Sequence, residues 1–135
     1  MNPYNEHLPL VMLIEDNEYI HGIISHVLGD KFKVLAFNNG IDALAYMQNG
    51  NFPDIIISDI NMPGLGGFQL LQQLKSSGFF SSIPVIMLSG EDSSETRIKF
   101  LEAGADDFMI KPFNPRELET KLKITLRRSG KLAAC

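Results

Sequence analysis

The sequence predicts an α/β protein in which a doubly wound, five-stranded parallel sheet is covered by five helices. Five short apolar runs alternate with stretches of helical periodicity, and these runs occupy residues 10–14, 32–37, 55–58, 85–88 and 108–110. Several runs are continuous rather than alternating, which is typical of parallel strands buried on both faces. Five repeats of a strand and a helix predict parallel pairing, and right-handed crossovers then place helices on both faces of the sheet.

Apolar residues at helical spacing mark the first three helices. The first stripe follows the i, i+3, i+4, i+7, i+8 pattern and consists of Ile20, Ile23, Ile24, Val27 and Leu28. The second and third helices are marked by shorter sets, which are Ile41, Leu44 and Ala45, and Phe68, Leu71 and Leu74. These spacings place one helix after each of the first three strands.

Capping signals mark the last two helices. Asp92, followed three residues later by Glu95, indicates a capping box at the start of the fourth helix, and Gly104 indicates its end. Asn114 before Pro115 predicts the start of the fifth helix, because asparagine is a good N-cap and proline fits the first helical position. We therefore expect these helices to begin near residues 93 and 115.

The composition fits one globular domain in a reducing compartment. The chain has 135 residues, of which 44% are apolar and 21% charged, and its net charge of −4 argues against a nucleic-acid surface. Cys135 is the only cysteine, so no disulfide forms within the chain. The longest apolar run, 10–14, is too short to span a membrane, and no lysine or arginine precedes it as in a secretory signal. We therefore expect a cytoplasmic protein that enters no membrane.

Polar residues follow four of the expected strands. These are Glu15 and Asp16, Asp59, Ser89 and Lys111. The carboxyl ends of parallel strands meet at one edge of the sheet, where ligands bind in such folds. Clustered carboxylates repel one another and need a cation, and an all-oxygen site shared with phosphate oxygens suits Mg2+. With a lysine and a hydroxyl for phosphoryl oxygens, the set predicts a phosphoryl-transfer site with a carboxylate nucleophile.

Each of these residues also has an ordinary structural interpretation. Asp16 alone could be an N-cap, Lys111 a solvated loop lysine, and Ser89 a turn residue. The functional interpretation is preferred because all these residue types occur together at the ends of the right strands. His21 and His26 lie about 140° apart around a helix at 3.6 residues per turn, so they do not suit one metal ion and are expected to fill the helix surface.

Two other segments are expected to be structural. The glycine-rich stretch 64–67 is interpreted as a turn before the third helix and not as a phosphate-binding loop. Phe79 and Phe80 are expected to pack under the edge of the sheet.

Four segments together resemble the receiver domains of response regulators in two-component signalling, of the chemotaxis-regulator type. The resemblance covers about residues 8–128, which leaves 1–7 as an N-terminal extension and 129–135 as a tail of the kind that a cloning vector adds. The intervals from Asp16 to Asp59, to Ser89 and to Lys111 are 43, 30 and 22 residues and also match this family. The segments that carry the resemblance are Leu-Ile-Glu-Asp-Asn at 13–17, Ile-Ser-Asp-Ile-Asn-Met-Pro-Gly at 57–64, Val-Ile-Met-Leu-Ser-Gly at 85–90 and Gly-Ala-Asp-Asp-Phe-Met-Ile-Lys-Pro-Phe at 104–113.

The resemblance implies a flavodoxin-like strand order of 2-1-3-4-5 and a set of site residues. Asp59 would accept a phosphoryl group from the phosphohistidine of a sensor histidine kinase or a phosphotransfer protein. Ser89 and Lys111 would hold phosphoryl oxygens, and the Lys111–Pro112 bond would be cis. Ser89 and Phe108 would form the switch. The Mg2+ ligands would be Glu15, Asp16, Asp59 and the main-chain carbonyl of Asn61.

The resemblance also implies what the domain does with the phosphoryl group. Its surface at 93–104, 108–110 and 114–128 would change on phosphorylation and contact an output domain, an output partner or a second copy. The domain would catalyse only its own Mg2+-assisted phosphorylation and dephosphorylation and would not be an enzyme for other substrates. A stand-alone regulator, a fragment of a hybrid kinase and the amino-terminal part of a transcription factor all remain open.

The sequence departs from the common family pattern at two positions. Glu15 stands where many family members have aspartate, and Gly66 where many have aspartate or asparagine. A phosphohydrolase of the haloacid-dehalogenase type would need a second acid at position 61, which is Asn61. A flavodoxin-like cofactor binder would not place Glu15 and Asp16 beside a phosphate. A phosphorylation-independent interaction domain would be expected to lack site residues, all of which are present.

Overall fold

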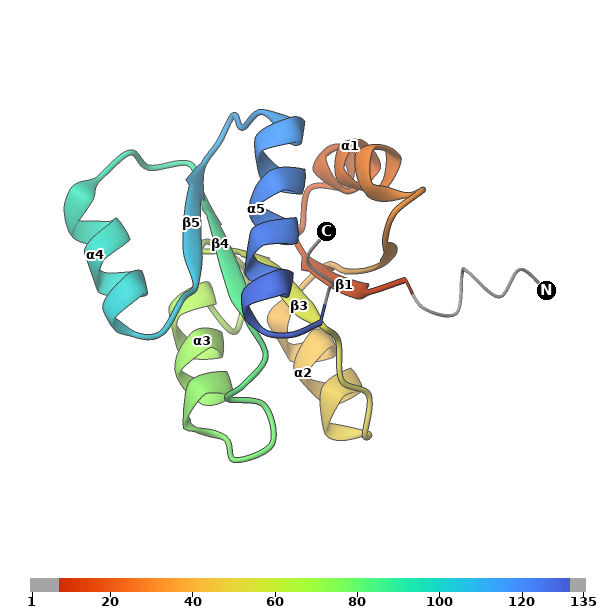
Figure 1. Cartoon of the computed structure of the whole chain (residues 1–135). Helices are drawn as coiled ribbons and strands as arrows, with labels where there is room; N and C mark the ends of the chain where they lie inside the picture. The colour runs from red at the N-terminus through yellow and green to blue at the C-terminus, as the bar shows by residue number, and fades with distance from the viewer. Residues whose placement is uncertain (1–7, 132–135) are drawn as a thin grey trace.

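The five expected strands form one parallel sheet. The computed structural model describes residues 8–131, so the extension 1–7 and residues 132–135, with Cys135, lie outside the described part of the chain. The strand order is β2-β1-β3-β4-β5, as predicted. Figure 1 labels β1, β3, β4 and β5 of this sheet. The strands are β1 (Leu10–Ile14), β2 (Lys33–Phe37), β3 (Ile55–Asp59), β4 (Val85–Ser89) and β5 (Asp107–Ile110).

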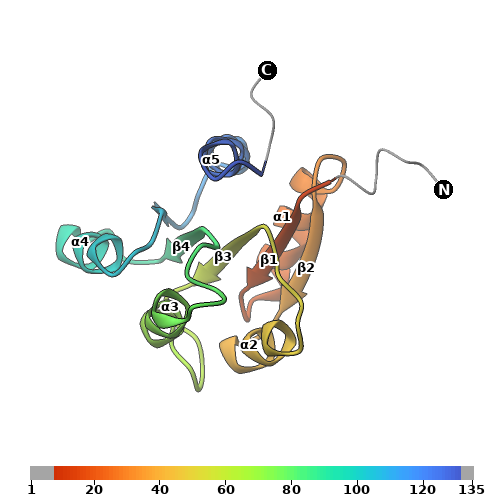
Figure 2. The ribbon, with the colours of Figure 1, turned by 60° about the horizontal axis from the view of Figure 1, so that its bottom comes forward.

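Each strand is followed by a helix, and the helices cover both faces of the sheet. The helices are α1 (Glu18–Leu28), α2 (Gly40–Gln48), α3 (Gly67–Ser76), α4 (Ser94–Glu102) and α5 (Pro115–Arg128). Helices α1 and α5 pack on one face and α2, α3 and α4 on the other (Figure 2). The doubly wound α/β class expected from the sequence is therefore the observed fold.

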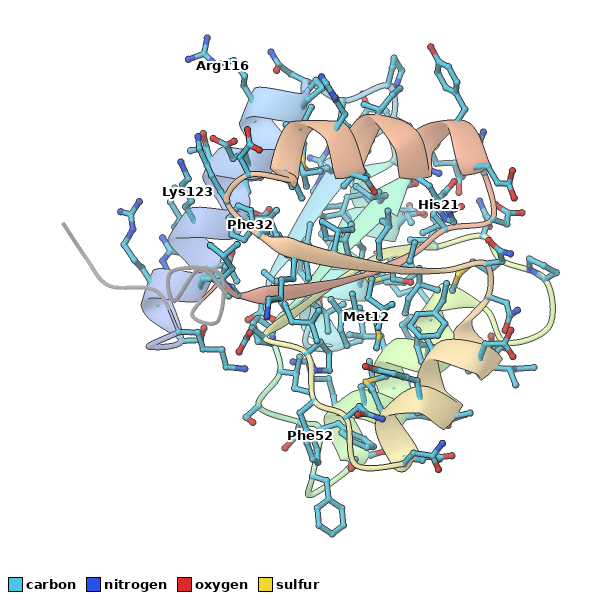
Figure 3. All side chains as sticks on the ribbon, turned by 90° about the vertical axis from the view of Figure 1, so that its right-hand side faces the viewer. Met12, His21, Phe32, Phe52, Arg116 and Lys123 are labelled. Atoms are coloured by element: carbon cyan, nitrogen blue, oxygen red, sulfur yellow. The ribbon has the colours of Figure 1, made fainter. Side chains whose placement is uncertain are left out.

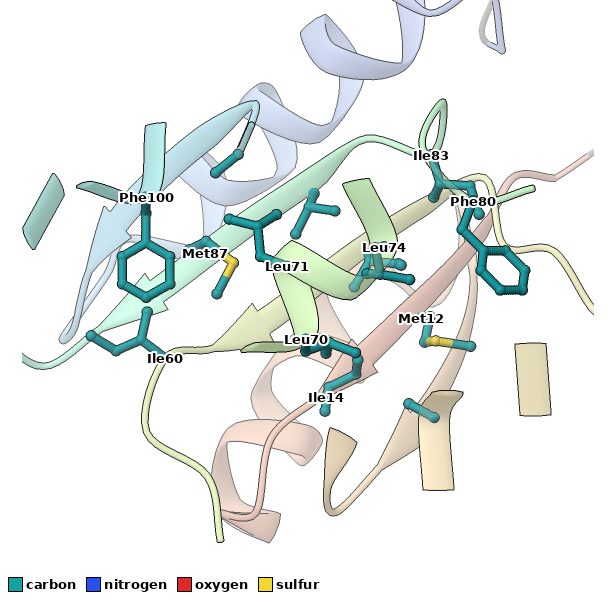
Figure 4. Close-up of a cluster of buried hydrophobic side chains, with 14 of the residues drawn as sticks. Met12, Ile14, Ile60, Leu70, Leu71, Leu74, Phe80, Ile83, Met87 and Phe100 are labelled. Atoms are coloured by element: carbon teal, nitrogen blue, oxygen red, sulfur yellow. The ribbon is translucent and has the colours of Figure 1, made fainter. Parts of the chain in front are cut away.

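Alternation along the buried strands divides the core in two. In β1, Met12 and Ile14 face the cluster under α2 and α3, whereas Val11 and Leu13 face the cluster under α1 and α5. Figure 4 shows the first cluster, with Leu70, Leu71 and Leu74 of α3 packed over the sheet. Because β1, β3 and β4 are buried on both faces, their apolar runs are continuous in the sequence.

The helix starts were predicted closely, with one correction. Asn114 caps α5 by accepting from the Arg116 N–H, with Pro115 in the first turn as expected. The cap of α4 is Ser93 and not Asp92, because the Ser93 hydroxyl accepts from the Thr96 N–H over 3.3 Å. Asp92 instead pairs with Arg97 at 3.3 Å on the surface.

Other differences concern single residues. Phe32 was placed at the start of the second strand, but it lies buried in the turn before Lys33, where β2 begins. Ile41 was taken to mark the second helix, yet it is 57% exposed, because α2 buries Ala43 and Met47 instead. Of the two adjacent phenylalanines, Phe80 joins the core as expected, whereas Phe79 is 79% exposed.

The register of the sheet brings the polar strand ends to one edge. Asp59 is the last residue of β3 and pairs with Leu88, and Ser89 is the last residue of β4 and pairs with Ile110. Both residues therefore belong to their strands rather than to the loops that follow. Lys111 comes directly after β5, and its N–H donates to the Ser89 carbonyl oxygen over 2.6 Å.

Candidate functional site

The site lies at the carboxyl end of the sheet, between β1, β3 and β5. Asp59 ends the central strand β3, and Glu15 follows β1 directly. The Glu15 N–H donates to the Phe37 carbonyl oxygen over 3.0 Å, which extends the β1–β2 ladder by one residue and keeps Glu15 against the sheet. Glu15 is 1% exposed and Asp59 6% exposed, so two carboxylates are buried at the same edge.

Lys111 bridges these two carboxylates. Its Nζ lies 3.1 Å from Glu15 Oε1 and 3.0 Å from Oε2, and 3.2 Å from Asp59 Oδ2. The lysine side chain is partly buried, with 20% of its surface exposed. One ammonium group therefore serves two carboxylates, and three residues from three strand ends meet as the sequence predicted.

Asp16 completes a cluster of three acids. Carboxylate oxygens of Glu15, Asp16 and Asp59 all lie within 4.8 Å of one another. Asp16 is exposed, and within residues 8–131 no hydrogen bond or ion pair of its carboxylate is found. Because three acids face only one lysine, the cluster has an excess of negative charge and the hard oxygen donors that Mg2+ prefers. The acidic cluster thus fits a Mg2+ site.

The pKa of Glu15 shows the effect of burial and of the neighbouring charges. Burial raises the pKa of Glu15 above its ordinary value of 4.5, and the nearby charge of Asp59 raises it further. The hydrogen bond and charge of Lys111 act in the opposite direction without cancelling the rise. A divalent cation beside Glu15 would favour its ionised form.

Asn61 and Ser89 lie next to this cluster but are arranged differently. The Asn61 N–H donates to Asp59 Oδ1 over 3.3 Å, which orients the carboxylate. The Ser89 hydroxyl is fully buried and is engaged with the following loop, since it accepts from the Glu91 N–H over 2.9 Å and donates to the Glu91 carbonyl oxygen over 3.2 Å. Ser89 is thus at the expected strand end, with its hydroxyl held by the loop.

Phe108 lies inside the protein rather than on its surface. The residue is 5% exposed, and its ring centroid is 5.9 Å from that of Phe100 in α4. Phe100 in turn meets Phe68 of α3 edge-on at 5.3 Å, and the Lys99 ammonium group lies 4.2 Å above the Phe68 ring. In this structure, Phe108 is thus buried while the Ser89 hydroxyl is hydrogen-bonded to Glu91.

Two residues near the site were not singled out for it by the sequence. His21 was expected to fill the helix surface, but its Nε2 contacts the Glu15 carbonyl oxygen. Gly67, the first residue of α3, lies so close to the end of β3 that an added Cβ would be 2.6 Å from the Asp59 carbonyl oxygen. Neither role has a sequence signal, because each depends on the packing of a helix against a distant strand end. The Lys111–Pro112 bond is cis, as the resemblance implied.

Comparison with known proteins identifies the family. The sequence model of the response regulator receiver domain family matches residues 11–123. The chain belongs to this family. Among curated proteins, the receiver domain is similar to the regulatory protein VanRc of Enterococcus gallinarum, with 35% identity over 87% of this chain and 50% of that protein. It is also 32% identical to the phosphate regulon transcriptional regulatory protein PhoB of Escherichia coli, over 91% of this chain and 54% of PhoB.

A solved structure gives the same result for the fold. The receiver domain of the Francisella response regulator 1452 is 33% identical and superposes with a TM-score of 0.82, over 90% of this chain and 98% of that one. The present receiver domain spans about half the length of the curated relatives. Its family places it in two-component signalling by phosphorylation. None of the helices in residues 8–131 combines the length and the apolar composition of a membrane span.

Proposed function

We propose that this receiver domain accepts a phosphoryl group on Asp59 from the phosphohistidine of a sensor histidine kinase or a phosphotransfer protein. The observation that carries the proposal is the position of Asp59, which ends the central strand within 3.2 Å of the Lys111 ammonium group and within 4.8 Å of two further acids. The domain is proposed to span residues 8–128, with 1–7 and 129–135 as additions to it.

The reaction is a transfer between two side chains. An Asp59 oxygen forms a bond to phosphorus while the bond from phosphorus to the histidine nitrogen breaks, and the released imidazole takes up a proton. Later attack by water on phosphorus regenerates the carboxylate and releases inorganic phosphate. No other substrate is converted, so the domain acts as a signalling element and not as an enzyme for small molecules.

Four groups would hold the Mg2+ ion, namely the carboxylates of Glu15, Asp16 and Asp59 and the main-chain carbonyl of Asn61. When bound, Mg2+ supplies positive charge that offsets the charge on the phosphoryl oxygens in the transition state. The surplus of acids over lysines supports this assignment. Burial of Glu15 and Asp59 excludes most water, which strengthens these charge interactions.

Lys111 and Ser89 are proposed to bind phosphoryl oxygens. Lys111 already lies beside Asp59, and its compact ammonium group can exchange a carboxylate contact for a phosphoryl oxygen. Ser89 would have to release its hydrogen bonds to Glu91 before its hydroxyl could donate to a phosphoryl oxygen. Phosphorylation would thereby alter the loop that leads into α4.

The output is proposed to be a change on the surface formed by α4, β5 and α5. Ser89 and Phe108 would act as the switch residues, and the chain's partner would be an output domain, a separate protein or a second copy. Phe108 is already buried in this structure, in which Asp59 carries no phosphoryl group. The ring does not need to move inward from the surface, so the signal is carried mainly by Ser89 and the loop after it.

Intact-mass spectrometry with acetyl phosphate tests the proposal. The wild type with Mg2+ should gain one phosphoryl group, and the adduct should be absent in EDTA and in Asp59→Asn. Asp30→Asn, an exposed acid between α1 and β2, is a matched control that should keep the adduct. An equal adduct in Asp59→Asn would show that the phosphoacceptor is another residue. A phosphorylated histidine phosphotransfer protein as donor tests the partner class in the same assay.

A further inference from the structure

We propose that His21 is a positioning residue for the metal site, because its ring holds the Glu15 carbonyl and so orients the Glu15–Asp16 peptide. His21 lies in the first half of α1 and points back to the end of β1 (Figure 3). Its Nε2 meets the carbonyl oxygen of a residue six positions earlier in the chain. This inference rests on the metal site proposed above.

The Glu15 carbonyl needs this partner because the sheet ends beside it. The β1–β2 ladder runs from the Lys33 N–H, which donates to Pro9, to the Glu15 N–H, which donates to Phe37. The next N–H along the ladder would come from Asn39. Asn39 has left the sheet, however, and caps α2 by accepting from the Asp42 N–H. Among residues 8–131, no main-chain N–H donates to the Glu15 carbonyl oxygen, and His21 takes the place of the missing donor.

The contact fixes the direction of two proposed ligands. The Glu15 carbonyl and the Asp16 N–H belong to one planar peptide unit, so a bond to the carbonyl sets the rotation of the whole unit. The Glu15 side chain leaves one end of this unit and the Asp16 side chain leaves the other. Lys111 holds the Glu15 carboxylate at 3.0 Å, whereas no ammonium group among the described residues contacts the Asp16 carboxylate in this way. For Asp16, the orientation of the peptide unit therefore limits the directions in which the side chain can leave the backbone toward the cluster.

The chemistry of the contact defines which side chains can replace histidine. A carbonyl oxygen only accepts hydrogen bonds, so Nε2 must carry the proton in this contact. Glutamine can place an amide N–H at a similar distance from the backbone. Phenylalanine keeps a flat ring of similar size but has no donor. His26, an exposed residue near the end of the same helix, provides a control at which the same change should have no effect on the metal site.

The test is a Mg2+ titration of the unphosphorylated protein, followed through the amide NMR shifts of Asp16 and Asn61. His21→Phe should weaken Mg2+ binding roughly tenfold, the scale of lost second-sphere support at metal sites. His21→Gln should stay within about twofold of the wild type, and His26→Phe should match it. A folded His21→Phe that binds Mg2+ like the wild type would overturn the inference.

Two further results distinguish a failure of the proposed metal site from a failure of the proposed role of His21. If the wild type and Asp16→Asn respond identically to Mg2+, the proposed metal site fails, and the inference that depends on it is also overturned. If the wild type binds Mg2+, Asp16→Asn binds it more weakly and His21→Phe binds it like the wild type, the metal site stands and only the inference about His21 fails.

The imidazole nitrogen NMR spectrum of the wild type tests the contact without any variant. A protonated Nε2 with slow solvent exchange supports the contact, and an unprotonated Nε2 overturns it.

Discussion

The ammonium group of Lys111 lies 3.1 and 3.0 Å from the two carboxylate oxygens of Glu15, a residue 96 positions away in the sequence. Glu15 is 1% exposed, so this contact compensates a charge that water does not reach. Lys111 is proposed to bind a phosphoryl group that is present only transiently. The same lysine thus also stabilises the unphosphorylated protein.

Replacing Lys111 with methionine should destabilise the metal-free domain by about 1–3 kcal/mol, because a buried carboxylate then loses its partner. Urea unfolding in EDTA measures this change. The double variant Lys111→Met, Glu15→Gln should recover a substantial part of the loss, since no unpaired Glu15 charge remains. Strictly additive effects of the two substitutions would mean that the ion pair contributes nothing to stability.

Glu15→Gln should change how stability depends on pH. Because the pKa of Glu15 is raised in the folded state, Glu15 favours folding most below its ordinary value of 4.5, and this contribution is lost as the pH rises through the higher folded pKa. In EDTA, the stability of Glu15→Gln relative to the wild type should therefore increase from about pH 4 to pH 7. Thermal melts at several pH values measure the difference. A difference that is constant across this range would contradict the raised pKa.

Asp16→Asn should separate metal binding from stability. Asp16 is exposed and its carboxylate has no ion pair within the described residues, while it lies close to two other acids. Its neutral variant loses no contact and relieves repulsion, so it should melt at or above the wild-type temperature in EDTA. Mg2+ at ten times its dissociation constant should stabilise the wild type by about 1.4 kcal/mol. The variant should show little of this gain. A full Mg2+ response in Asp16→Asn would exclude Asp16 as a ligand.

Gly67→Ala should be destabilising by about 1–3 kcal/mol, because its Cβ would overlap the backbone of Asp59 and Ile60. Gly22 is the matched control within α1, where an added Cβ has no atom within 4 Å. Gly22→Ala should stabilise the domain by about 0.5–1 kcal/mol through helix propensity. Urea unfolding of both variants is the measurement. Equal effects of the two substitutions would mean that α3 can shift away from β3 at no cost.

Beryllofluoride, a phosphoryl mimic, should reduce the hydrogen-exchange protection of the Glu91 amide. This N–H donates to the Ser89 hydroxyl over 2.9 Å, and that hydroxyl is proposed to turn toward the phosphoryl group. In Ser89→Ala the Glu91 amide should exchange fast with or without the mimic. Protection changes should extend into α4, the helix into which this loop leads. Unchanged exchange at Glu91 in the wild type would contradict the proposed movement of Ser89.

The fold and the edge at which the site lies could be predicted from the amino-acid sequence. Continuous apolar runs predicted buried parallel strands, and polar residues directly after them marked the carboxyl edge. These signals are local, since a strand end and the residue that follows it are adjacent in the chain. The same locality made Asn114 a reliable helix cap.

The contacts that these residues make could not be predicted from the sequence, because they depend on how the helices and strands pack. The pairing of Lys111 with Glu15, the closeness of Gly67 to Asp59, and the reach of His21 to a strand end each join different elements. Such contacts depend on the angle at which a helix packs and on where a neighbouring strand stops. Ser89 and Phe108 show the same limit, because the sequence named both residues but left the direction of a hydroxyl and the burial of a ring to the packing around them.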